Sequence, residues 1–417
     1  MRIIKENHQG LSTILSFALI PLSGLATDIY LPSLPSMASH LNVTNAAVQL
    51  TLLLFMVSSG ISQLFVGSLL DSFGRFRLGI SALILFALAS FSIALTHNIY
   101  VLYFMRVLQG IAVATIVVGK RAYFVDIYSG EKLRHYTSLF SIVWATAPIV
   151  APFIGGYLQA SFGWQSNFYF LGIFALVIVV LELIYGGESL KNFQQFKVRS
   201  IVQVYSSMLK TPDFSLGLIM IALCYSMLVV FGMTSPFIIE HVFHYSPVIT
   251  GYSSLVSGVA LMTGGMISKA LIRRPLSKKI TTAIFLQLFF SALMIAVSGL
   301  RTNLYTLMPF VLIIHLLAGF IFNNLFAYCL GRFSKNAGVA SGITGGLLYI
   351  ITSLFSYGIV NSVIIKNQGL LGGAYLTLAL LLYIVFLLFN RARFAYSTAS
   401  TTTLKSQATV GQANLSS

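Results

Sequence analysis

The first long apolar run of the chain ends in the stretch Leu25-Ala26-Thr27-Asp28-Ile29-Tyr30-Leu31-Pro32-Ser33-Leu34-Pro35. The run begins near Leu11 and is longer than the about 20 residues that a helix needs to cross a bilayer. Asp28 is therefore expected within the hydrocarbon layer, where a charge costs at least about 3 kcal/mol on the insertion scale unless it is shielded. Because the chain has only nine acidic residues, one of them at this depth indicates a site for protons or cations.

The composition of the whole chain excludes a water-soluble fold. Of its 417 residues 57% are hydrophobic and only 8% are charged, whereas a soluble domain carries about 25% charged residues. The net charge of +16 does not indicate nucleic-acid binding, because the basic residues form short clusters between apolar runs. Positive charge kept on one side of a membrane explains these clusters better. We therefore predict a polytopic membrane protein.

Apolar runs recur along the chain and predict an all-α integral membrane protein with twelve transmembrane helices. They lie at about 13–35, 47–70, 78–96, 100–124, 136–160, 166–187, 214–238, 249–271, 280–299, 304–328, 338–364 and 370–390. The longest polar connection divides them six and six, so we expect two pseudo-symmetric six-helix bundles. The predicted organisation is an N-terminal bundle (1–187), a cytoplasmic linker (188–213), a C-terminal bundle (214–391) and a disordered cytoplasmic tail (392–417).

Lysine and arginine predict the orientation, because an even number of spans places both termini on the same side. If that side is the cytoplasm, 22 of the 25 basic residues lie in cytoplasmic segments. Only Arg301 and Lys366 lie on the other side, and Arg106 is inside an apolar run. This asymmetry predicts that both termini are cytoplasmic.

The loop between the second and third runs has the sequence Gly67-Ser68-Leu69-Leu70-Asp71-Ser72-Phe73-Gly74-Arg75-Phe76-Arg77. Gly67 lets another helix approach closely, and Gly74 permits a tight turn. Asp71 can accept hydrogen bonds from the N-terminus of a neighbouring helix or pair with an arginine. Such a contact can hold one conformation and release another. The alternative is an ordinary short loop with anchoring charges.

This loop resembles the signature G-x-L-a-D-r-x-G-r-k of the major facilitator superfamily at Gly67, Asp71, Gly74, Arg75 and Arg77. Residues 103–110 resemble the fourth-helix motif R-x-x-Q-G, and residues 147–156 resemble the fifth-helix motif of drug/proton antiporters. Finer marks are similar to the bicyclomycin and chloramphenicol resistance (Bcr/CflA) group, namely 27–32, Arg121-Ala122 with Asp126, 235–237 and 340–342. The resemblance covers about residues 1–392 and implies two bundles that rock about a central cavity.

Asp28 and Arg106 are the two clearest charges inside the apolar runs. Each lies roughly 10 Å from the outer end of its run at the rise of an α-helix. The resemblance implies that helices one and four are neighbours, so the two side chains can face each other as a proton-coupling pair. The alternative is a static ion pair that only fixes packing. Ile20 stands where some related multidrug antiporters carry a second acid, which favours neutral, zwitterionic or anionic cargo.

The resemblance also implies two further groups of residues. A conformational latch is implied at Gly67, Asp71, Gly74, Arg75, Arg77, Arg121 and Asp126. A hinge and seal in the fifth helix is implied at Pro148, Pro152, Gly155 and Gly156. The alternative for this helix is close packing through its glycines.

The many aromatic residues favour a broad apolar cavity with few polar anchors. Candidate cavity residues are Tyr30, Gln109, Tyr123, Tyr225, His315, Asn323 and Asn324. His315 can instead be a hydrogen-bonded packing residue. Glu182, near the end of the sixth run, is expected to be solvated at the membrane interface.

The sequence contains no phosphate-binding loop G-x-x-x-x-G-K-[ST], no nucleophile elbow and no zinc-helix motif. We therefore expect neither an enzyme with catalytic residues nor direct ATP drive. The two cysteines, Cys224 and Cys329, lie in or near apolar runs far apart in sequence, and we expect no disulfide, no metal site and no cofactor.

These patterns together predict a proton-coupled antiporter that exports small amphipathic drugs or metabolites across a bacterial inner membrane. We expect a monomer whose partners are cargo, protons and lipid. A dedicated exporter or importer of one metabolite, such as a siderophore, would have the same fold. A third alternative is a transport-inactive membrane sensor, against which the intact loop signature and the intramembrane charges argue.

Overall fold

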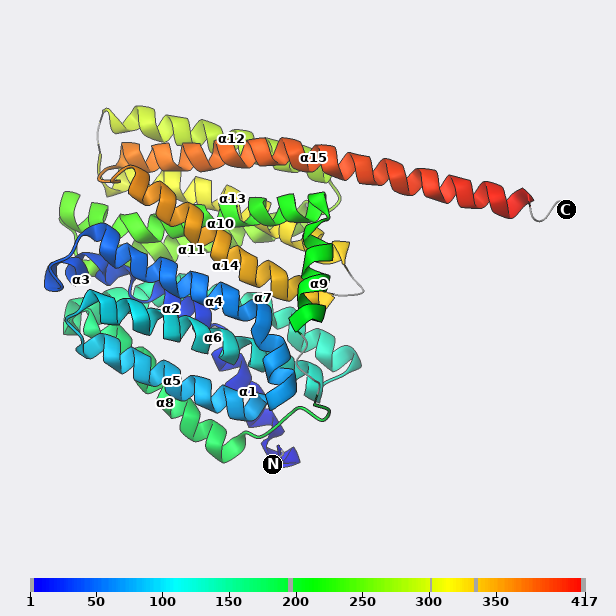
Figure 1. The fold of residues 1–417 in the computed structure, drawn as a ribbon. Helices are drawn as coiled ribbons and strands as arrows, with labels where there is room; N and C mark the ends of the chain where they lie inside the picture. Colours follow the sequence, from blue (N-terminus) through cyan, green and yellow to red (C-terminus); the bar gives the residue numbers. More distant parts are fainter. Residues whose placement is uncertain (1–3, 194–197, 301, 334–336, 414–417) are drawn as a thin grey trace.

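The structure, a computed structural model, describes the backbone of residues 4–193, 198–300, 302–333 and 337–413. Side chains are described for the same residues except 141, 142, 145, 198–201, 337–339 and 395–413. Every regular element in this part of the chain is a helix, and the long helices run side by side as a bundle (Figure 1). The prediction of an all-α fold is confirmed.

Eleven segments of the described residues are long and apolar enough to cross a membrane. Besides the N-terminal segment they contain α4 (Asn45–Phe73), α5 (Arg75–Leu95), α6 (Ile99–Ile127), α8 (Gln165–Tyr185), α10 (Pro212–Phe237), α11 (Pro247–Ala270), α12 (Leu276–Ser298), α13 (Leu304–Arg332), α14 (Ala337–Ser362) and α15 (Gln368–Ala413). The remaining predicted run, 136–160, lies in α7 (Gly130–Phe162), a helix of 33 residues with three side chains outside the described set.

The first apolar run is not one continuous helix. It consists of α1 (Gln9–Leu19), α2 (Leu22–Asp28), η2 (Leu31–Ser33) and α3 (Leu34–His40), preceded by η1 (Glu6–His8). Breaks occur at Pro21 and next to Pro32, because proline lacks a backbone N–H and its ring clashes with the preceding turn. The expected single helix over 13–35 is therefore wrong in detail, and Asp28 is the last residue of α2.

The helices form two halves, with α1 to α8 in the first and α10 to α15 in the second (Figure 1). In the first half α6 packs against α4 and α5, and α5 packs against α8. In the second half α10 packs against α13, α14 and α15, and α12 packs against α15. The boundary between the halves is formed mainly by α7 against α11 and by α4 against α14.

Glycines allow the helices of the two halves to approach closely at this boundary. A Cβ atom added to Gly60 of α4 would lie 2.6 Å from the backbone oxygen of Gly346 in α14. A Cβ atom added to Gly156 of α7 would lie 2.6 Å from the backbone oxygen of Pro247 in α11. Any larger side chain at either position would push the halves apart.

We call the end of the bundle where α1 begins the terminus end, and the other the opposite end. At the opposite end, hydrogen bonds join the two halves. Gln49 Nε2 donates to the backbone oxygen of Met233 at 2.9 Å, and the hydroxyl oxygens of Tyr157 and Tyr252 lie 2.9 Å apart. All ion pairs among the described residues lie within one half. The halves are therefore held together at the opposite end by neutral contacts.

A short helix, α9 (Val198–Leu209), crosses the terminus end of the bundle at a steep angle to the long helices (Figure 1). It lies within the predicted linker, where no helix is predicted from the sequence. The Tyr205 hydroxyl donates to the backbone oxygen of Leu64 in α4 at 3.0 Å. Burial raises the pKa of Tyr205, so this hydroxyl remains a donor at neutral pH. The linker thus contacts the first half just before α10 begins at Pro212.

The last helix, α15, continues to Ala413, and its final part projects away from the bundle (Figure 1). The structure differs here from the predicted disordered tail over 392–417. A physical reason is that a helix already nucleated by its apolar part is extended at little further cost. Residues 414–417 lie outside the described residues.

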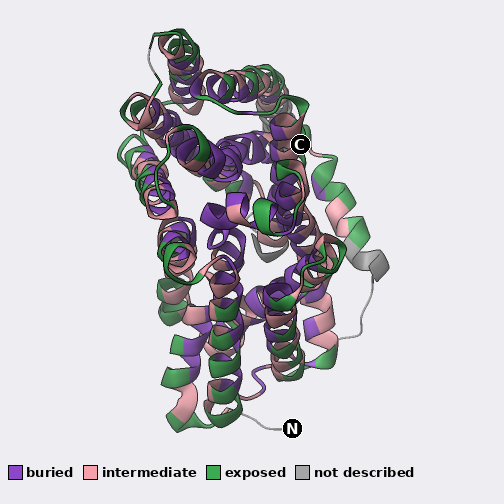
Figure 2. Cartoon of the chain, turned by 90° about the vertical axis from the view of Figure 1, so that its left-hand side faces the viewer, coloured by how far each residue is buried: buried purple, intermediate pink, exposed green. Residues whose placement is uncertain are grey.

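Large apolar side chains cover the outward faces of the helices, as contact with lipid requires. Leu88 of α5, Phe104 of α6, Ile173 of α8, Phe289 of α12 and Leu354 of α14 are each more than half exposed. Buried residues lie toward the interior of the bundle (Figure 2). This distribution is that of a protein whose surroundings are apolar.

Candidate functional site

Arg106 of α6 is fully buried and bonds mainly to uncharged oxygen atoms. Its Nη1 donates to the backbone oxygen of Ala26 at 3.2 Å and to Oε1 of Gln109 at 2.9 Å. Its Nε donates to the backbone oxygen of Thr51 at 3.4 Å. The side chain therefore links α6 to α2 and to α4, all within the first half.

Two aromatic rings lie against the same guanidinium. Its Cζ atom is 4.6 Å from the centroid of the Tyr30 ring and 4.2 Å from that of Phe55. Cation–π contacts of this kind stabilise a desolvated guanidinium. Among the described residues Arg106 has no carboxylate partner, so the predicted pair with Asp28 is wrong for this structure. The reason is the end of α2, beyond which Tyr30 turns its ring toward Arg106.

Asp28 is buried at the boundary between the halves, with an exposed fraction of 7%. Its Oδ2 has no hydrogen-bond partner among the described residues. The carboxylate lies within electrostatic range of the hydroxyl groups of Tyr225 in α10 and Tyr349 in α14. Both tyrosines belong to the second half. An acid that is buried without a fixed partner is costly, and inside a membrane such a residue is a candidate for function.

Tyr225 connects this acid to the aromatic residues around it. The centroid of its ring lies 6.0 Å from that of Trp144 in α7 and 6.2 Å from that of Phe322 in α13. Tyr225 is one of the cavity residues predicted from the sequence, whereas Trp144 and Tyr349 are not among them. No sequence signal separates these two from the many other aromatic residues, because their role depends on which way their helices face.

Arg121 also lies on α6, roughly 22 Å nearer the terminus end than Arg106 at the rise of an α-helix. Its Nε is buried and has no hydrogen-bond partner among the described residues. The guanidinium lies within electrostatic range of the Tyr349 hydroxyl. The predicted grouping of Arg121 with Asp126 is not seen, because Asp126 is paired with Arg75.

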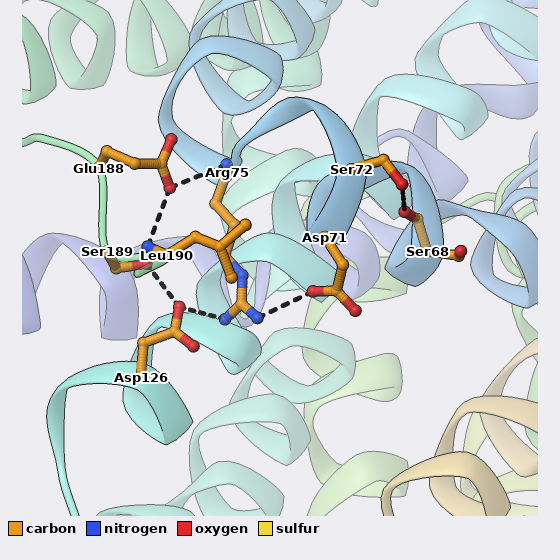
Figure 3. A network of polar contacts seen from close by, with 8 residues as sticks. All are labelled: Ser68, Asp71, Ser72, Arg75, Asp126, Glu188, Ser189 and Leu190. Atoms are coloured by element: carbon orange, nitrogen blue, oxygen red, sulfur yellow. Dashed lines mark hydrogen bonds and ion pairs between the residues drawn. The ribbon is translucent and has the colours of Figure 1, made fainter. Parts of the chain in front are cut away.

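The loop signature forms a network of charges at the terminus end (Figure 3). The Arg75 guanidinium bonds to Asp71 at 3.0 Å and also to Asp126 of α6. The Ser189 hydroxyl donates to Oδ2 of Asp126 at 2.7 Å. Gly74 has a φ of 91°, which a glycine adopts without strain and which lets α5 begin directly after α4. The network joins α4, α5, α6 and the start of the linker.

Glu188 of the linker completes this network (Figure 3). Its carboxylate accepts hydrogen bonds from the backbone N–H groups of Arg75 and Phe76, both at 3.1 Å. These are the first N–H groups of α5, where a negative charge is favoured. Glu188 is 5% exposed. From the sequence, Glu188 is only the first residue of the linker, because a helix terminus far away in sequence gives no local signal.

Two residues of the loop signature lie outside the network. Arg77 is exposed. A Cβ atom added to Gly67 would lie 4.0 Å from Val118, which is an ordinary contact, so no close helix approach depends on Gly67. Of the residues predicted to form a latch, Asp71, Arg75 and Asp126 take part in the network of Figure 3, and Gly74 forms the turn between α4 and α5. Their role as a latch stays a prediction.

Each half has one more buried ion pair at the terminus end. In the first half, Lys120 Nζ lies 2.5 Å from Oε1 of Glu182. Because Glu182 is only 2% exposed, the expectation of a solvated glutamate is wrong. In the second half, Oδ2 of Asp213 accepts hydrogen bonds from Arg332 Nε at 2.9 Å and from the Tyr328 hydroxyl at 2.7 Å. These pairs tie helix ends together within one half.

Most of the predicted cavity residues have partners inside their own half. The side-chain hydrogen bonds join Tyr123 to Thr13, His315 to Tyr375, Asn323 to Gly265 and Asn324 to Phe320. Gln109 and Tyr30 hold Arg106, as described above. Among the seven candidates, the structure places Tyr225 beside Asp28. His315 fits the alternative of a packing residue.

The predicted hinge of the fifth helix lies in α7, which is continuous although Pro148 and Pro152 are inside it. A Cβ atom added to Gly155 would lie 1.6 Å from the backbone oxygen of Ile29, just after α2. The next residue, Gly156, faces α11 of the second half. The glycines of α7 therefore serve close packing on two sides.

Two helical halves around a buried acid, with a charge network at one end, are typical of membrane transporters built from two helix bundles. The sequence profile of the Major Facilitator Superfamily matches residues 17–356, and the chain belongs to this family.

Several curated relatives share this family. The chain is 27% identical to the MFS-type transporter YdgK of Bacillus subtilis over 80% of this chain and 85% of that protein. It is 26% identical to the multidrug resistance protein MdtL of Vibrio parahaemolyticus over 79% and 83%. A bicyclomycin resistance protein homolog of Haemophilus influenzae is 32% identical over 43% of this chain and 45% of its own length. These names agree with the resemblance to the Bcr/CflA group.

Solved structures share the fold. A bacterial homolog of the human lysosomal transporter Spinster, solved in an inward-facing and unoccupied conformation, aligns with a TM-score of 0.65. The alignment covers 96% of this chain and 98% of that chain at 15% identity. At this identity the structural likeness supports the fold class alone.

Proposed function

We propose that this transporter exports small amphipathic molecules across the bacterial inner membrane in exchange for protons that move inward. Relatives named for multidrug and bicyclomycin resistance support efflux of such molecules. The distribution of lysine and arginine supports a cytoplasmic terminus end. In that orientation, the contacts between the halves at the opposite end close the side that faces away from the cytoplasm.

The observation that carries the proposal is Asp28, a buried carboxylate without a fixed counter-charge. It lies within electrostatic range of two tyrosine hydroxyls of the other half, so its surroundings change whenever the halves move relative to one another. A carboxylate in such a position binds a proton while the pathway opens to one side and releases it while the pathway opens to the other. Proton uptake and cargo release are then coupled through the same movement.

Arg106 has a positioning role in this proposal. Its guanidinium bonds to the backbone at Ala26 and lies against Tyr30, and these two residues are on either side of Asp28. Arg106 thereby fixes the end of α2 without neutralising the carboxylate. Asp28 remains free to gain and lose a proton.

The test compares Asp28→Asn with wild type in proteoliposomes that contain a pH-sensitive dye. Addition of chloramphenicol or bicyclomycin should release protons through the wild-type protein and should cause at least tenfold less proton movement through the variant. Glu131→Gln is the matched control, because Glu131 is an exposed acid at the start of α7. Asp28→Glu should retain part of the activity.

Normal proton movement through Asp28→Asn would contradict the proposed role of this acid. Proton movement with one small metabolite and with none of the antibiotics would favour a dedicated carrier instead. Absence of flux with every cargo would favour the sensor.

A further inference from the structure

We propose that Arg121 binds an anionic group of the cargo, so that the transporter prefers organic anions and zwitterions to organic cations. This inference rests on the proposed export function and adds the class of substrate. It is drawn from the groups at the boundary of the halves that lack partners and from the balance of charge around them.

Two buried polar atoms of opposite charge near this boundary have no hydrogen-bond partner among the described residues. They are Oδ2 of Asp28 on α2 and Nε of Arg121 on α6. Tyr349 is 4% exposed and lies within electrostatic range of both charged groups. The great majority of buried polar atoms in proteins are paired, so two unpaired charged groups within electrostatic range of the same hydroxyl indicate a site that a ligand completes.

The charges around this boundary leave Arg121 without compensation. In the first half Lys120 is paired with Glu182, and Arg75 is paired with two aspartates. The group found within electrostatic range of the Arg121 guanidinium is the neutral Tyr349 hydroxyl. Arg121 therefore carries an uncompensated positive charge on the terminus side of Tyr349.

The position of Arg121 suits a cargo that enters from the terminus end. The residue lies about two helical turns before the end of α6, between that end and the level of Asp28. A planar guanidinium offers a carboxylate or a phosphate two parallel hydrogen bonds, which a cationic or neutral group cannot accept in the same way. The half-buried position strengthens this attraction relative to bulk water.

The test measures equilibrium binding to the purified full-length protein in nanodiscs, without a pH gradient. Three probes of matched shape are 2-naphthoate, 2-naphthamide and 2-naphthylmethylammonium. Wild type should bind 2-naphthoate at least tenfold more tightly than the other two. Arg121→Gln should lose this tenfold preference while its affinity for 2-naphthamide stays within twofold of wild type, and Arg121→Lys should retain part of the preference.

Arg134→Gln is the control, because it removes an exposed arginine from the same end of the bundle. The inference is overturned if wild type binds none of the probes or prefers the ammonium. It is also overturned if Arg121→Gln keeps the preference for 2-naphthoate. Equal loss of affinity for 2-naphthoate and 2-naphthamide would overturn it as well, since Arg121 would then be a structural residue.

Failure of this inference and failure of the proposed function are separate results. The binding experiment involves no proton movement, and it reads only the charge preference of the site. The proteoliposome experiment with Asp28→Asn reads proton coupling, whichever cargo is used. A preference for 2-naphthoate without proton movement would retain the anion site and remove the antiport mechanism.

Discussion

Arg106 is stabilised by carbonyl oxygens, an amide oxygen and two aromatic rings rather than by a carboxylate. Such an arrangement depends on the planar shape of the guanidinium, since its Nη1 and Nε atoms donate three hydrogen bonds while the same flat group lies against two rings. A lysine ammonium is a compact point charge and cannot make the same set of contacts. The charge of Arg106 alone therefore does not explain its place in the structure.

Arg106→Lys should lower the thermal unfolding midpoint of the purified protein. The loss of two desolvated cation–π contacts corresponds to roughly 2 kcal/mol or more. Arg77→Lys, at an exposed position, should leave the midpoint unchanged. An unfolding midpoint of Arg106→Lys equal to that of wild type would show that the rings and oxygens do not depend on the guanidinium geometry.

The two intramembrane charges also show what a sequence reveals about single residues. Hydropathy predicted correctly that Asp28 and Arg106 are buried, because burial follows from the length of the apolar runs. Hydropathy did not predict that the two charged side chains are not paired with each other. Whether they meet depends on the direction of the side chains next to a break caused by proline. Arg121 was expected in the latch because the resemblance groups it with Asp126, although the two side chains have different neighbours in the structure.

At the scale of elements, the charge network at the terminus end connects three helices to the linker. Asp126 is the more enclosed of the two aspartates bound to Arg75, since its side chain is 13% exposed against 38% for Asp71. An exposed pair contributes about 0–1 kcal/mol, whereas breaking a more buried pair leaves a guanidinium without its partner. The two aspartates should therefore differ in importance.

Asp126→Asn should slow transport more than Asp71→Asn does. We expect at least a fivefold reduction in the rate of cargo export for Asp126→Asn and about a twofold reduction for Asp71→Asn, with cargo affinity nearly unchanged in both. Initial rates and binding in proteoliposomes measure the two quantities. The assignment fails if Asp71→Asn is the slower variant or if either one loses affinity while its turnover is unchanged.

At the scale of the whole molecule, the two halves meet through neutral contacts at the opposite end, while the ion pairs of the described residues stay within one half. Contacts without charge cost little to separate, because no buried ion is left unpaired. Alternating access requires such a separation in every cycle. Holding these contacts together should therefore stop transport.

A short bifunctional maleimide should join the halves of the double variant Tyr157→Cys, Tyr252→Cys. The two native cysteines, Cys224 and Cys329, are buried and should not react. We expect cargo export to fall at least tenfold, whereas binding of cargo from the terminus end should persist. Each single cysteine variant treated in the same way is the control. Full export by the joined protein would show that the opposite end does not open.

The architecture was largely accessible from the sequence, since twelve apolar runs and one long polar connection predict an all-helical membrane protein. Details that depend on contacts between segments far apart in the sequence could not be predicted. The helix α9 and the cap formed by Glu188 both arise from partners far away in the chain, and the extension of α15 depends on an apolar segment that precedes the polar tail. The broken first run was indicated by its prolines, but the positions of the breaks were not.

Gly155 and Gly156 of α7 each meet a backbone oxygen, one in each half of the molecule. Adjacent residues project about 100° apart around a helix. Within a single turn, α7 is therefore in close contact with backbone oxygens in two directions. Rotation of α7 about its long axis would bring one of these oxygen atoms into a steric clash with the α7 backbone. In this conformation α7 therefore has no freedom to rotate about its own axis, and any movement between the halves that turns this helix must first open one of the two contacts.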